Sequence, residues 1–226
     1  MMFPQAIIFD MDGLLIDTEK VSESTFRQTC YAHQASIVAD QYLQLIGRNQ
    51  SEQRAIFADL LPVHVNIVRF DKEWRDLFLH NLRHDVPLKP YALALCRWLK
   101  SKQLPMAVAT STQTLKAEAL LERAGLLEFI DVVIGGDQVD QGKPAPDLYI
   151  KAAAAIDCPP EQALAFEDSH QGIRSAHAAG ISFVHIPDLM PADDFTRQHA
   201  LFVSENLSLA AIHLGWSLET DSFDPR

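Results

Sequence analysis

The feature that most constrains this chain is a series of short apolar runs, most of which end at a cluster of polar residues. Such runs are typical of strands that are buried on both faces of a parallel sheet. Stretches with helical periodicity separate most of the runs, and this alternation predicts an α/β fold with a doubly wound parallel sheet. The predicted strands are Ala6 to Phe9, Met106 to Ala109, Val132 to Ile134, Ala163 to Phe166 and Ile181 to Ile186, and the predicted helices are Ala92 to Lys102, Leu115 to Ala124, Pro146 to Ala155 and Gly172 to Ala179.

One interval breaks this alternation. Residues 17–87 show amphipathic, mainly helical patterns, for example in SESTFRQTCYAHQ and RFDKEWRDLFLHNLRH, without a buried strand. We interpret this interval as a helical domain inserted after the first strand, so that residues 1–16 and 88–226 form the core domain. Pro87 and Pro90 mark the return to the core, because proline disfavours a helical conformation in the residue before it. Beyond Pro187, one further short helix is predicted from Leu207 to Leu214.

The charge of the chain narrows the range of partners. Lys and Arg number 19 and Asp and Glu 30, a net charge of −11 that on average repels a nucleic-acid backbone. A small phosphorylated molecule remains possible, because one local cation and a few backbone amides can bind it. No run approaches the roughly 18 apolar residues of a membrane span, and the N-terminus lacks the basic region of an export signal.

The cysteines bear on the cellular compartment, and the helical patterns bear on the oligomeric state. Cys30, Cys96 and Cys158 are odd in number and far apart, which favours a reduced, cytoplasmic protein without disulfides. We expect neither a nucleic acid nor a membrane as a partner. Because no long heptad or apolar stripe demands another chain, we expect a monomer rather than an oligomer.

Residues capable of chemistry stand at the ends of the predicted strands. In open parallel sheets, ligands bind at the carboxyl ends of the strands, near the point where the strand order reverses. The residues at those ends, or in the loops that follow, are Asp10 and Asp12 after the first strand, Thr110 and Ser111 after the second, Lys143 after the third, and Glu167 and Asp168 at the fourth.

Each of these clusters also has an ordinary structural interpretation. Asp-Gly in FDMDG is common in hairpin turns, but no alternating strand follows it here. Thr110 could cap a helix, and Lys143 could be an exposed loop lysine. The acids in FEDSHQG could simply favour a helix N-terminus. The joint occurrence of all these groups, in this order at successive strand ends, is much harder to explain in this way.

Together the residues predict phosphoryl transfer. Asp10 can attack phosphorus while Asp12 protonates the leaving oxygen and later deprotonates water. A fixed ammonium at Lys143 would offset the repulsion between an anionic nucleophile and an anionic substrate. Magnesium prefers oxygen ligands and usually keeps several waters, so it could bind Asp10 and Asp168, with Glu167 acting directly or through water.

The motifs in which these residues stand resemble those of a known family. FDMDGLLIDTE, ATST, GKPAPD and FEDSHQGIRSAHAAG are similar, in order and spacing, to the four motifs of the haloacid dehalogenase superfamily. The similarity extends from about Ile7 to Ile186. It implies a Rossmann-like core with an α-helical cap, as in the subgroup of sugar phosphatases and β-phosphoglucomutases.

The resemblance also implies a role for each motif residue. Asp10 would form an aspartyl-phosphate, Asp12 would be general acid and base, Thr110 would bind the transferring phosphoryl group and Lys143 would stabilise it. Mg²⁺ would be held by Asp10, the backbone carbonyl of Asp12 and Asp168, with Glu167 assisting.

Further residues are expected to contact the substrate. Gly13 follows the first motif acids, and Ser111 and Thr112 belong to the second motif. In the insertion, LIGRNQ resembles a Leu-x-Gly-Arg segment that faces the active site in these relatives. Gly47 would let the backbone approach the substrate, and Arg48 would contact one of its polar or phosphate groups; an exposed loop arginine is the alternative.

The second acid separates the chemistries of the superfamily. Haloacid dehalogenases proper and phosphonatases replace the aspartate that stands here as Asp12, so phosphatase or mutase remains. The related mutases carry a lysine soon after the second motif, near the place of Gln113, and we therefore expect hydrolysis of a sugar phosphate or similar metabolite. A β-phosphoglucomutase-like mutase stays open, and so does a non-catalytic, receiver-like phosphoacceptor, although the insertion and Asp12 count against the latter.

Overall fold

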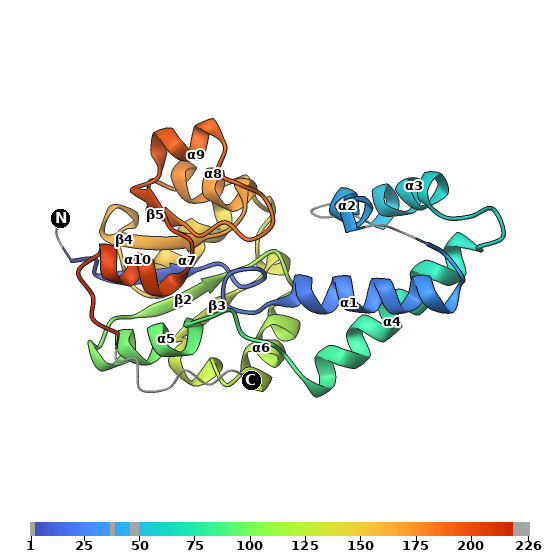
Figure 1. The fold of residues 1–226 in the computed structure, drawn as a ribbon. Coiled ribbons are helices and arrows are strands. Elements are labelled where there is room, and N and C mark those ends of the chain that lie inside the picture. The colour runs from blue at the N-terminus through green and yellow to red at the C-terminus, as the bar shows by residue number, and fades with distance from the viewer. Residues whose placement is uncertain (1–2, 37–38, 46–49, 219–226) are drawn as a thin grey trace. The chain divides into compact units, whose positions relative to one another are not determined.

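The chain forms two compact units. The structure, a computed structural model, describes residues 3–36, 39–45 and 50–218 (Figure 1). One unit comprises the chain up to Asp17 and from Val86 onward, and the other comprises Thr18–Asp85. The second unit is thus inserted into the first after its first strand.

The first unit is built around a parallel sheet, which in the described residues has six strands in the order β3-β2-β1-β4-β5-β6. The strands are β1 Ala6–Phe9, β2 Met106–Ala109, β3 Val132–Ile134, β4 Ala163–Glu167, β5 Ser182–His185 and β6 Phe202–Val203. From β1 the chain builds outward to β3 on one side and then returns to build β4, β5 and β6 on the other. The strand order therefore reverses at β1, and the predicted doubly wound sheet is confirmed.

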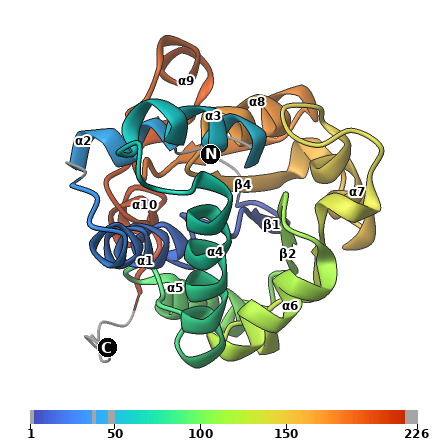
Figure 2. The ribbon, with the colours of Figure 1, turned by 90° about the vertical axis from the view of Figure 1, so that its right-hand side faces the viewer.

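Helices cover the two faces of this sheet. The α-helices are α5 Ala92–Ser101, α6 Thr114–Arg123, α7 Asp147–Ala155, α8 His170–Ala178, α9 Asp194–His199 and α10 Leu207–His213, and the 3₁₀ helices are η2 Leu127–Phe129, η3 Gly136–Gln138 and η4 Pro160–Gln162. In Figure 2, strands β4, β1 and β2 run down the middle of this unit, with α7 on one side and α5 and α10 on the other.

On the face covered by α7 and α8, small and branched side chains fill the core. Alternate residues of a strand point to opposite faces of its sheet. Ile8, Ala107 and Ala165 point to this face and belong to the same buried cluster as Leu148 of α7 and Ile173 of α8. Small strand residues let these helices approach the sheet closely, which brings the start of α7 and of α8 to the ends of the strands.

On the opposite face, aromatic rings form the core. Phe9 and Phe166, on neighbouring strands, stack with ring centroids 5.5 Å apart. Trp216, which follows α10, lies 6.1 Å from Phe166 and stacks at 5.2 Å on Trp98 of α5. The end of the described chain is thereby held against the sheet.

The second unit is helical and has a core of its own. Its elements are α1 Thr18–Ala32, α2 Ala39–Tyr42, the 3₁₀ helix η1 Leu43–Leu45, α3 Gln50–Leu60 and α4 Ile67–His84. The ring of Phe26 lies 6.1 Å from Phe57, 5.7 Å from Phe70 and 5.2 Å from Trp74, between centroids. Throughout the described part of the chain, no helix is long and apolar enough to cross a membrane.

The chain beyond Pro187 differs from its prediction. The predicted helix at 207–214 is present as α10, but α9 and the two-residue strand β6 were not predicted. Helix α9 begins with a side-chain cap, since Oδ1 of Asp193 accepts a hydrogen bond from the backbone N–H of Thr196 at 2.8 Å. An acid directly before a short polar segment, able to cap a helix there, was the signal in the sequence.

The second unit also contains a buried charge cluster around Asp71. This carboxylate is fully buried; Oδ2 accepts hydrogen bonds from Gln50 and Arg54 at 2.8 Å, and Oδ1 accepts one from Arg75 at 2.8 Å. Burial by itself would raise the pKa of Asp71, but the hydrogen bonds from Gln50 and Arg54 and the charge of Arg75 outweigh it and lower the pKa below its usual value of 3.8. The cluster ties α3 to α4.

We predict that Asp71→Asn lowers the free energy of unfolding at pH 7 by about 2 kcal/mol, because hydrogen bonds to a buried charge are lost. As the pH falls below 3.8, wild-type Asp71 is itself protonated at its lowered pKa, so the difference between the two proteins should shrink. Urea unfolding across this pH range measures both effects. The control is Asp76→Asn, which removes an exposed carboxylate paired with Lys72 on the same helix and should cost much less. Equal losses in the two variants would contradict the prediction.

Candidate active site

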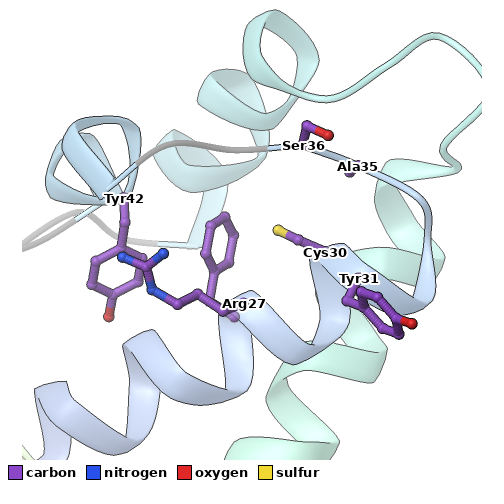
Figure 3. Close-up of a pocket in the computed structure, with 7 residues that line it drawn as sticks. Arg27, Cys30, Tyr31, Ala35, Ser36 and Tyr42 are labelled. Carbon is purple, nitrogen blue, oxygen red and sulfur yellow. The ribbon is translucent and has the colours of Figure 1, made fainter.

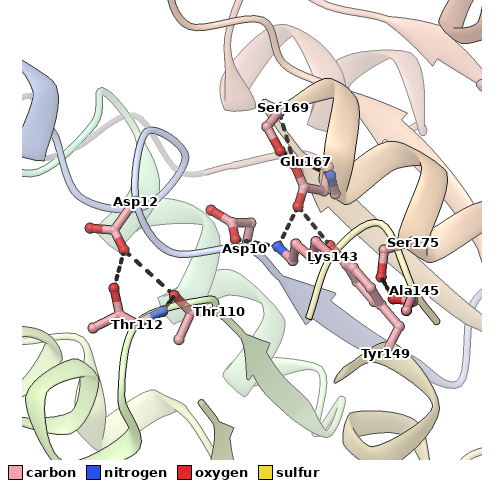
Figure 4. Close-up of polar contacts among 11 residues, drawn as sticks. Asp10, Asp12, Thr110, Thr112, Lys143, Ala145, Tyr149, Glu167, Ser169 and Ser175 are labelled. Carbon is pink, nitrogen blue, oxygen red and sulfur yellow. Dashed lines mark hydrogen bonds and ion pairs between the residues drawn. The ribbon is translucent and has the colours of Figure 1, made fainter. Parts of the chain in front are cut away.

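The carboxyl ends of the central strands gather the predicted residues at one edge of the sheet (Figure 4). Phe9 pairs with Val108 of β2 and with Phe166 of β4, so the residues that follow Phe9 come level with the ends of both neighbours. This is the point where the strand order reverses. Lys143 reaches the same place from the loop that precedes α7.

Asp10 is a buried carboxylate held by a buried lysine. Its side chain is 10% exposed, and its Oδ1 accepts a hydrogen bond from Nζ of Lys143 at 2.5 Å. Burial raises the pKa of Asp10 to about 7; Lys143 opposes this change, and the negative charge of Glu167 adds to it. One lysine thus does not fully compensate this carboxylate, which leaves it receptive to a further cation.

Glu167 holds the other side of Lys143. Its Oε1 accepts hydrogen bonds from Nζ of Lys143 at 2.5 Å and from the hydroxyl of Tyr149 at 3.2 Å. Its Oε2 accepts bonds from the backbone N–H and the hydroxyl of Ser169 at 2.8 and 3.0 Å. The carboxylate is fully buried, and a Cβ on Gly172 would overlap it. Protein donors thus bind both of its oxygens, and the expectation that Glu167 assists a metal stays a prediction.

Lys143 is therefore a buried ammonium between two carboxylates. Burial by itself would lower the pKa of Lys143, but the charges of Asp10 and Glu167 outweigh it and raise the pKa above 10.5. The side chain is 5% exposed and keeps its positive charge. Because its position is fixed before any ligand binds, the ammonium is preorganised to stabilise an anion that binds beside Asp10.

Asp12 is oriented by two hydroxyls from the loop after β2. Its Oδ2 accepts hydrogen bonds from Thr112 at 2.9 Å and from Thr110 at 3.5 Å. Thr110 is itself buried, and its hydroxyl oxygen accepts a bond from the backbone N–H of Thr112 at 3.1 Å. Thr112 was expected to bind substrate; in the structure its hydroxyl donates to Asp12.

Gly13 allows Asp168 to approach the first loop. The backbone of Gly13 has φ +89°, a conformation that other residues rarely adopt, and a Cβ there would lie 2.5 Å from Oδ2 of Asp168. Oδ1 of Asp168 is buried and accepts no hydrogen bond from any residue in the described ranges. Burial, followed by the negative charges of Glu167 and Asp10, raises the pKa of Asp168 well above its usual value.

The backbone of Asp168 is fixed by a hydrogen bond from His185, a residue that was not predicted to belong to the site. Nε2 of His185 donates to the backbone carbonyl of Asp168 at 2.9 Å. His185 is fully buried and pairs with Glu167 in the register of β4 and β5. A histidine at the end of the apolar run ISFVHI, level with the fourth motif, was the available signal.

The donor set fits a magnesium ion. A buried carboxylate oxygen without a partner on Asp168, beside an Asp10 carboxylate that its lysine only partly compensates, is what a divalent cation would satisfy. No three His, Cys, Asp or Glu side chains in the described parts of the chain are grouped so that they could hold a metal by themselves. Magnesium would therefore need a backbone carbonyl, water or substrate oxygens beside these two side chains, which is its usual preference.

The remaining residues that were predicted to contact the substrate are Ser111, Gly47 and Arg48. Ser111 is exposed at the start of the loop that leads to α6. Gly47 and Arg48 lie outside the described residues. A pocket of about 340 Å³ does occur in the helical unit, lined by Phe26, Arg27, Cys30, Tyr31, Ala35, Ser36 and Tyr42 (Figure 3). Its lining is mostly apolar and contains none of the residues at the ends of the strands, which we call the strand-end cluster: Asp10, Asp12, Thr110, Lys143, Glu167 and Asp168.

Comparison with known proteins identifies the family. Residues 7–186 match the haloacid dehalogenase-like hydrolase family. The chain belongs to this family. The match covers the four motifs quoted above, and the expected membership is confirmed.

Curated relatives of the chain in this hydrolase family include phosphatases. It is 31% identical over 185 residues to a phosphorylated carbohydrates phosphatase of Thermotoga maritima, covering 80% of this chain and 84% of that protein. It is 31% identical over 182 residues to the fructose-1-phosphate phosphatase YqaB of Escherichia coli, covering 80% and 95%. It is 32% identical over 205 residues to protein CbbY of Rhodobacter capsulatus, covering 85% and 89%.

Solved structures of the family share its fold. A putative β-phosphoglucomutase from Thermotoga maritima aligns with a TM-score of 0.80 at 26% identity, covering 93% of this chain and 99% of that one. A variant of CbbY from Rhodobacter sphaeroides in complex with xylulose-(1,5)bisphosphate aligns with a TM-score of 0.69 at 28% identity, covering 90% and 95%.

We predict that Gly172→Ala lowers the free energy of unfolding by about 2 kcal/mol or more, because the new Cβ would force the Glu167 carboxylate out of its place. Chemical denaturation measures the loss. Gly142→Ala is the control: nothing lies within 4 Å of a Cβ at that position, so its stability should stay within about 0.5 kcal/mol of wild type. A Gly172→Ala variant as stable as this control would show that Glu167 is not confined as described.

Proposed function

We propose that this hydrolase is a Mg²⁺-dependent phosphatase that releases phosphate from a small phosphate monoester, a sugar phosphate or similar metabolite, through an aspartyl-phosphate on Asp10. The observation that carries the proposal is the buried Asp10 carboxylate, held 2.5 Å from Lys143 at the reversal point of the sheet. An acid held in place two residues later, Asp12, supplies the proton transfers that such a route requires.

The names of the relatives support this choice of substrate class. Two of the proteins most similar to this chain are phosphatases of phosphorylated carbohydrates or of fructose 1-phosphate. A related structure contains xylulose-(1,5)bisphosphate. The compounds in these names are sugars that carry phosphate esters. The net charge of −11 also favours a small molecule over a nucleic acid.

In the first half of the proposed reaction, the free oxygen of Asp10 attacks the phosphorus of the ester. The bond between phosphorus and the alcohol oxygen breaks, and Asp12 gives its proton to that oxygen. The hydroxyls of Thr112 and Thr110 keep Asp12 in place for this transfer. Lys143 lowers the repulsion between the nucleophile and the incoming phosphate and stabilises charge on the phosphoryl oxygens.

In the second half, water attacks the phosphorus of the aspartyl-phosphate. Asp12, now a carboxylate, accepts a proton from this water, and the bond between phosphorus and Asp10 breaks. Inorganic phosphate leaves, and the Asp10 carboxylate and the protonated Asp12 are restored. Atoms and charges therefore balance over the cycle.

Magnesium would be held by Asp10, Asp168 and the backbone carbonyl of Asp12. When bound, it would supply positive charge that screens the phosphate oxygens from the surrounding carboxylates. We assign Glu167 a different part from the one expected from the sequence: it holds Lys143 and is not a direct ligand. Its two oxygens accept four hydrogen bonds from protein donors.

The two alternatives, a β-phosphoglucomutase-like mutase and a non-catalytic phosphoacceptor, are less well supported. Gln113, where related mutases carry a lysine, has an exposed side chain at the start of α6. A passive phosphoacceptor has no need of the Asp12 site, and the chain belongs to a family of hydrolases. We therefore place phosphate release first.

We predict that Asp10→Asn lowers turnover at least about a thousandfold, because a neutral amide is a very poor nucleophile. The fold should persist, since Lys143 keeps its contact with Glu167. Phosphate release and acid-quenched labelling with a ³²P-ester would measure the loss of both turnover and covalent phosphoprotein. The matched control is Asp140→Asn, which changes an exposed acid in the loop before Lys143 and should leave turnover within about twofold. Phosphoprotein formed at wild-type levels by Asp10→Asn would exclude Asp10 as the phosphorylated residue, and near-normal turnover by this variant would refute the aspartyl-phosphate route.

We further predict that a panel of sugar phosphates yields inorganic phosphate with Mg²⁺, and that EDTA lowers this release at least about a hundredfold until excess Mg²⁺ is added. Mg²⁺ should also raise the unfolding temperature, since it binds the folded protein. A parallel assay follows conversion of glucose 1-phosphate to glucose 6-phosphate. Isomerisation without phosphate release would show that the protein is a mutase and not a phosphatase. Full activity in EDTA would exclude a requirement for Mg²⁺.

A further inference from the structure

The aromatic ring of Tyr149 packs against the ammonium of Lys143, although Tyr149 was not among the residues predicted from the motifs. It belongs to the first turn of α7, six residues after Lys143, and its side chain is fully buried. Nζ of Lys143 lies 5.2 Å from the centroid of its ring. Its hydroxyl points to Glu167 and donates to Oε1 at 3.2 Å (Figure 4).

The hydroxyl and the lysine share one acceptor atom. Oε1 of Glu167 accepts a hydrogen bond from Tyr149 and another from Lys143, while Oε2 is held by Ser169. Burial, then the negative charges of Glu167 and Asp10, raises the pKa of Tyr149 well above its usual value, so the hydroxyl keeps its proton and remains a donor. Because the hydroxyl bonds the same oxygen as the ammonium, it fixes the position of Oε1 and thereby the acceptor that holds Lys143 beside Asp10.

The ring supplies a second constraint on the ammonium. An aromatic face attracts a cation within about 6 Å of its centroid, and more strongly when both groups are shielded from water. Lys143 and Tyr149 are both almost fully buried. If Asp10 becomes phosphorylated, its carboxylate charge is lost as the acyl phosphate forms, whereas the ring face remains. The ring therefore limits the movement of Lys143 through the cycle.

We propose that Tyr149 is a positioning residue of this active site, whose hydroxyl and ring hold the Lys143 ammonium between Asp10 and Glu167. The proposal rests on the phosphatase function above, because it gives Tyr149 a part in stabilising the transferring phosphoryl group. It predicts that loss of the hydroxyl affects the chemical step more than substrate binding, since the position of Lys143 matters most as charge moves onto the phosphoryl oxygens.

The test compares Tyr149→Phe with wild type in Mg²⁺, with p-nitrophenyl phosphate as the probe. We expect kcat to fall about tenfold, the size expected for one hydrogen bond to a charged group, while KM changes by less than about twofold. The ¹⁵N-lysine ammonium spectrum gives a readout independent of turnover. The Lys143 signal, assigned by its absence in Lys143→Arg, should move in Tyr149→Phe, and should move further in Tyr149→Leu, which also lacks the ring.

Tyr42→Phe is the matched control. Tyr42 is likewise buried, and its hydroxyl is hydrogen-bonded to an acid and a hydroxyl, Glu19 at 3.0 Å and Ser22 at 2.8 Å, but it belongs to the helical unit. We expect the two Phe variants to lose similar stability, and kcat of Tyr42→Phe to stay within about twofold of wild type. A kcat of Tyr149→Phe as high as that of the control would reduce Tyr149 to a packing residue and overturn the proposal.

The two readouts separate this proposal from the proposed function. A tenfold loss of kcat with an unmoved Lys143 signal would show that Tyr149 does not act through the lysine, and would overturn the proposal while leaving the phosphatase intact. Absence of wild-type turnover on this probe and on the sugar-phosphate panel would instead refute the phosphatase. The Lys143 signal would then decide by itself whether Tyr149 holds the ammonium.

Discussion

The site depends on one buried ammonium. Asp10 and Glu167 stand at the ends of adjacent strands, and the register of β1 and β4 places them level. Two carboxylates buried this close would repel each other and resist ionisation. Lys143, 2.5 Å from each, makes their charged forms compatible with burial. The loop before α7 must therefore close over the sheet, because removal of the lysine would leave two uncompensated charges.

The same ammonium leaves a defined electrostatic deficit. Asp168, the next acid along from Glu167, has a buried oxygen with no hydrogen-bond donor among the described residues, and Asp10 keeps a raised pKa in spite of Lys143. Charge neutralisation is thus complete on the side of Glu167 and incomplete on the side that faces Gly13. A hydrated divalent cation would supply the missing charge, and it would accept carboxylate oxygens with few geometric demands on the rest of the protein. The two neighbouring acids therefore differ: protein donors surround Glu167, whereas one oxygen of Asp168 is left for a cation to bind.

The sequence predicted the sheet and the gathering of its strand-end residues, because both follow from local patterns. Buried strands appear as apolar runs, and parallel strands necessarily present their carboxyl ends at one edge, so the contact between Lys143 and Asp10 could be expected. Roles that depend on side-chain partners could not be read in this way. Glu167 was expected to assist a metal, and only the fold reveals that Tyr149 of α7 and Ser169 of its own loop donate hydrogen bonds to it. His185 was hidden in an apolar run, since only pairing between β4 and β5 brings it to Asp168.

The two compact units have separate cores. The strand-end cluster lies wholly within the sheet-containing unit, where small residues such as Ala107 and Ala165 fix the distance between the sheet and the helices. The helical unit has an independent aromatic core around Phe26 and its own buried charge cluster around Asp71. Substitutions in one core therefore need not disturb the other. A chain built in this way can keep Asp10, Lys143 and Glu167 in fixed register while residues of its helical unit change, because the contacts that hold these three side chains all lie in the sheet-containing unit.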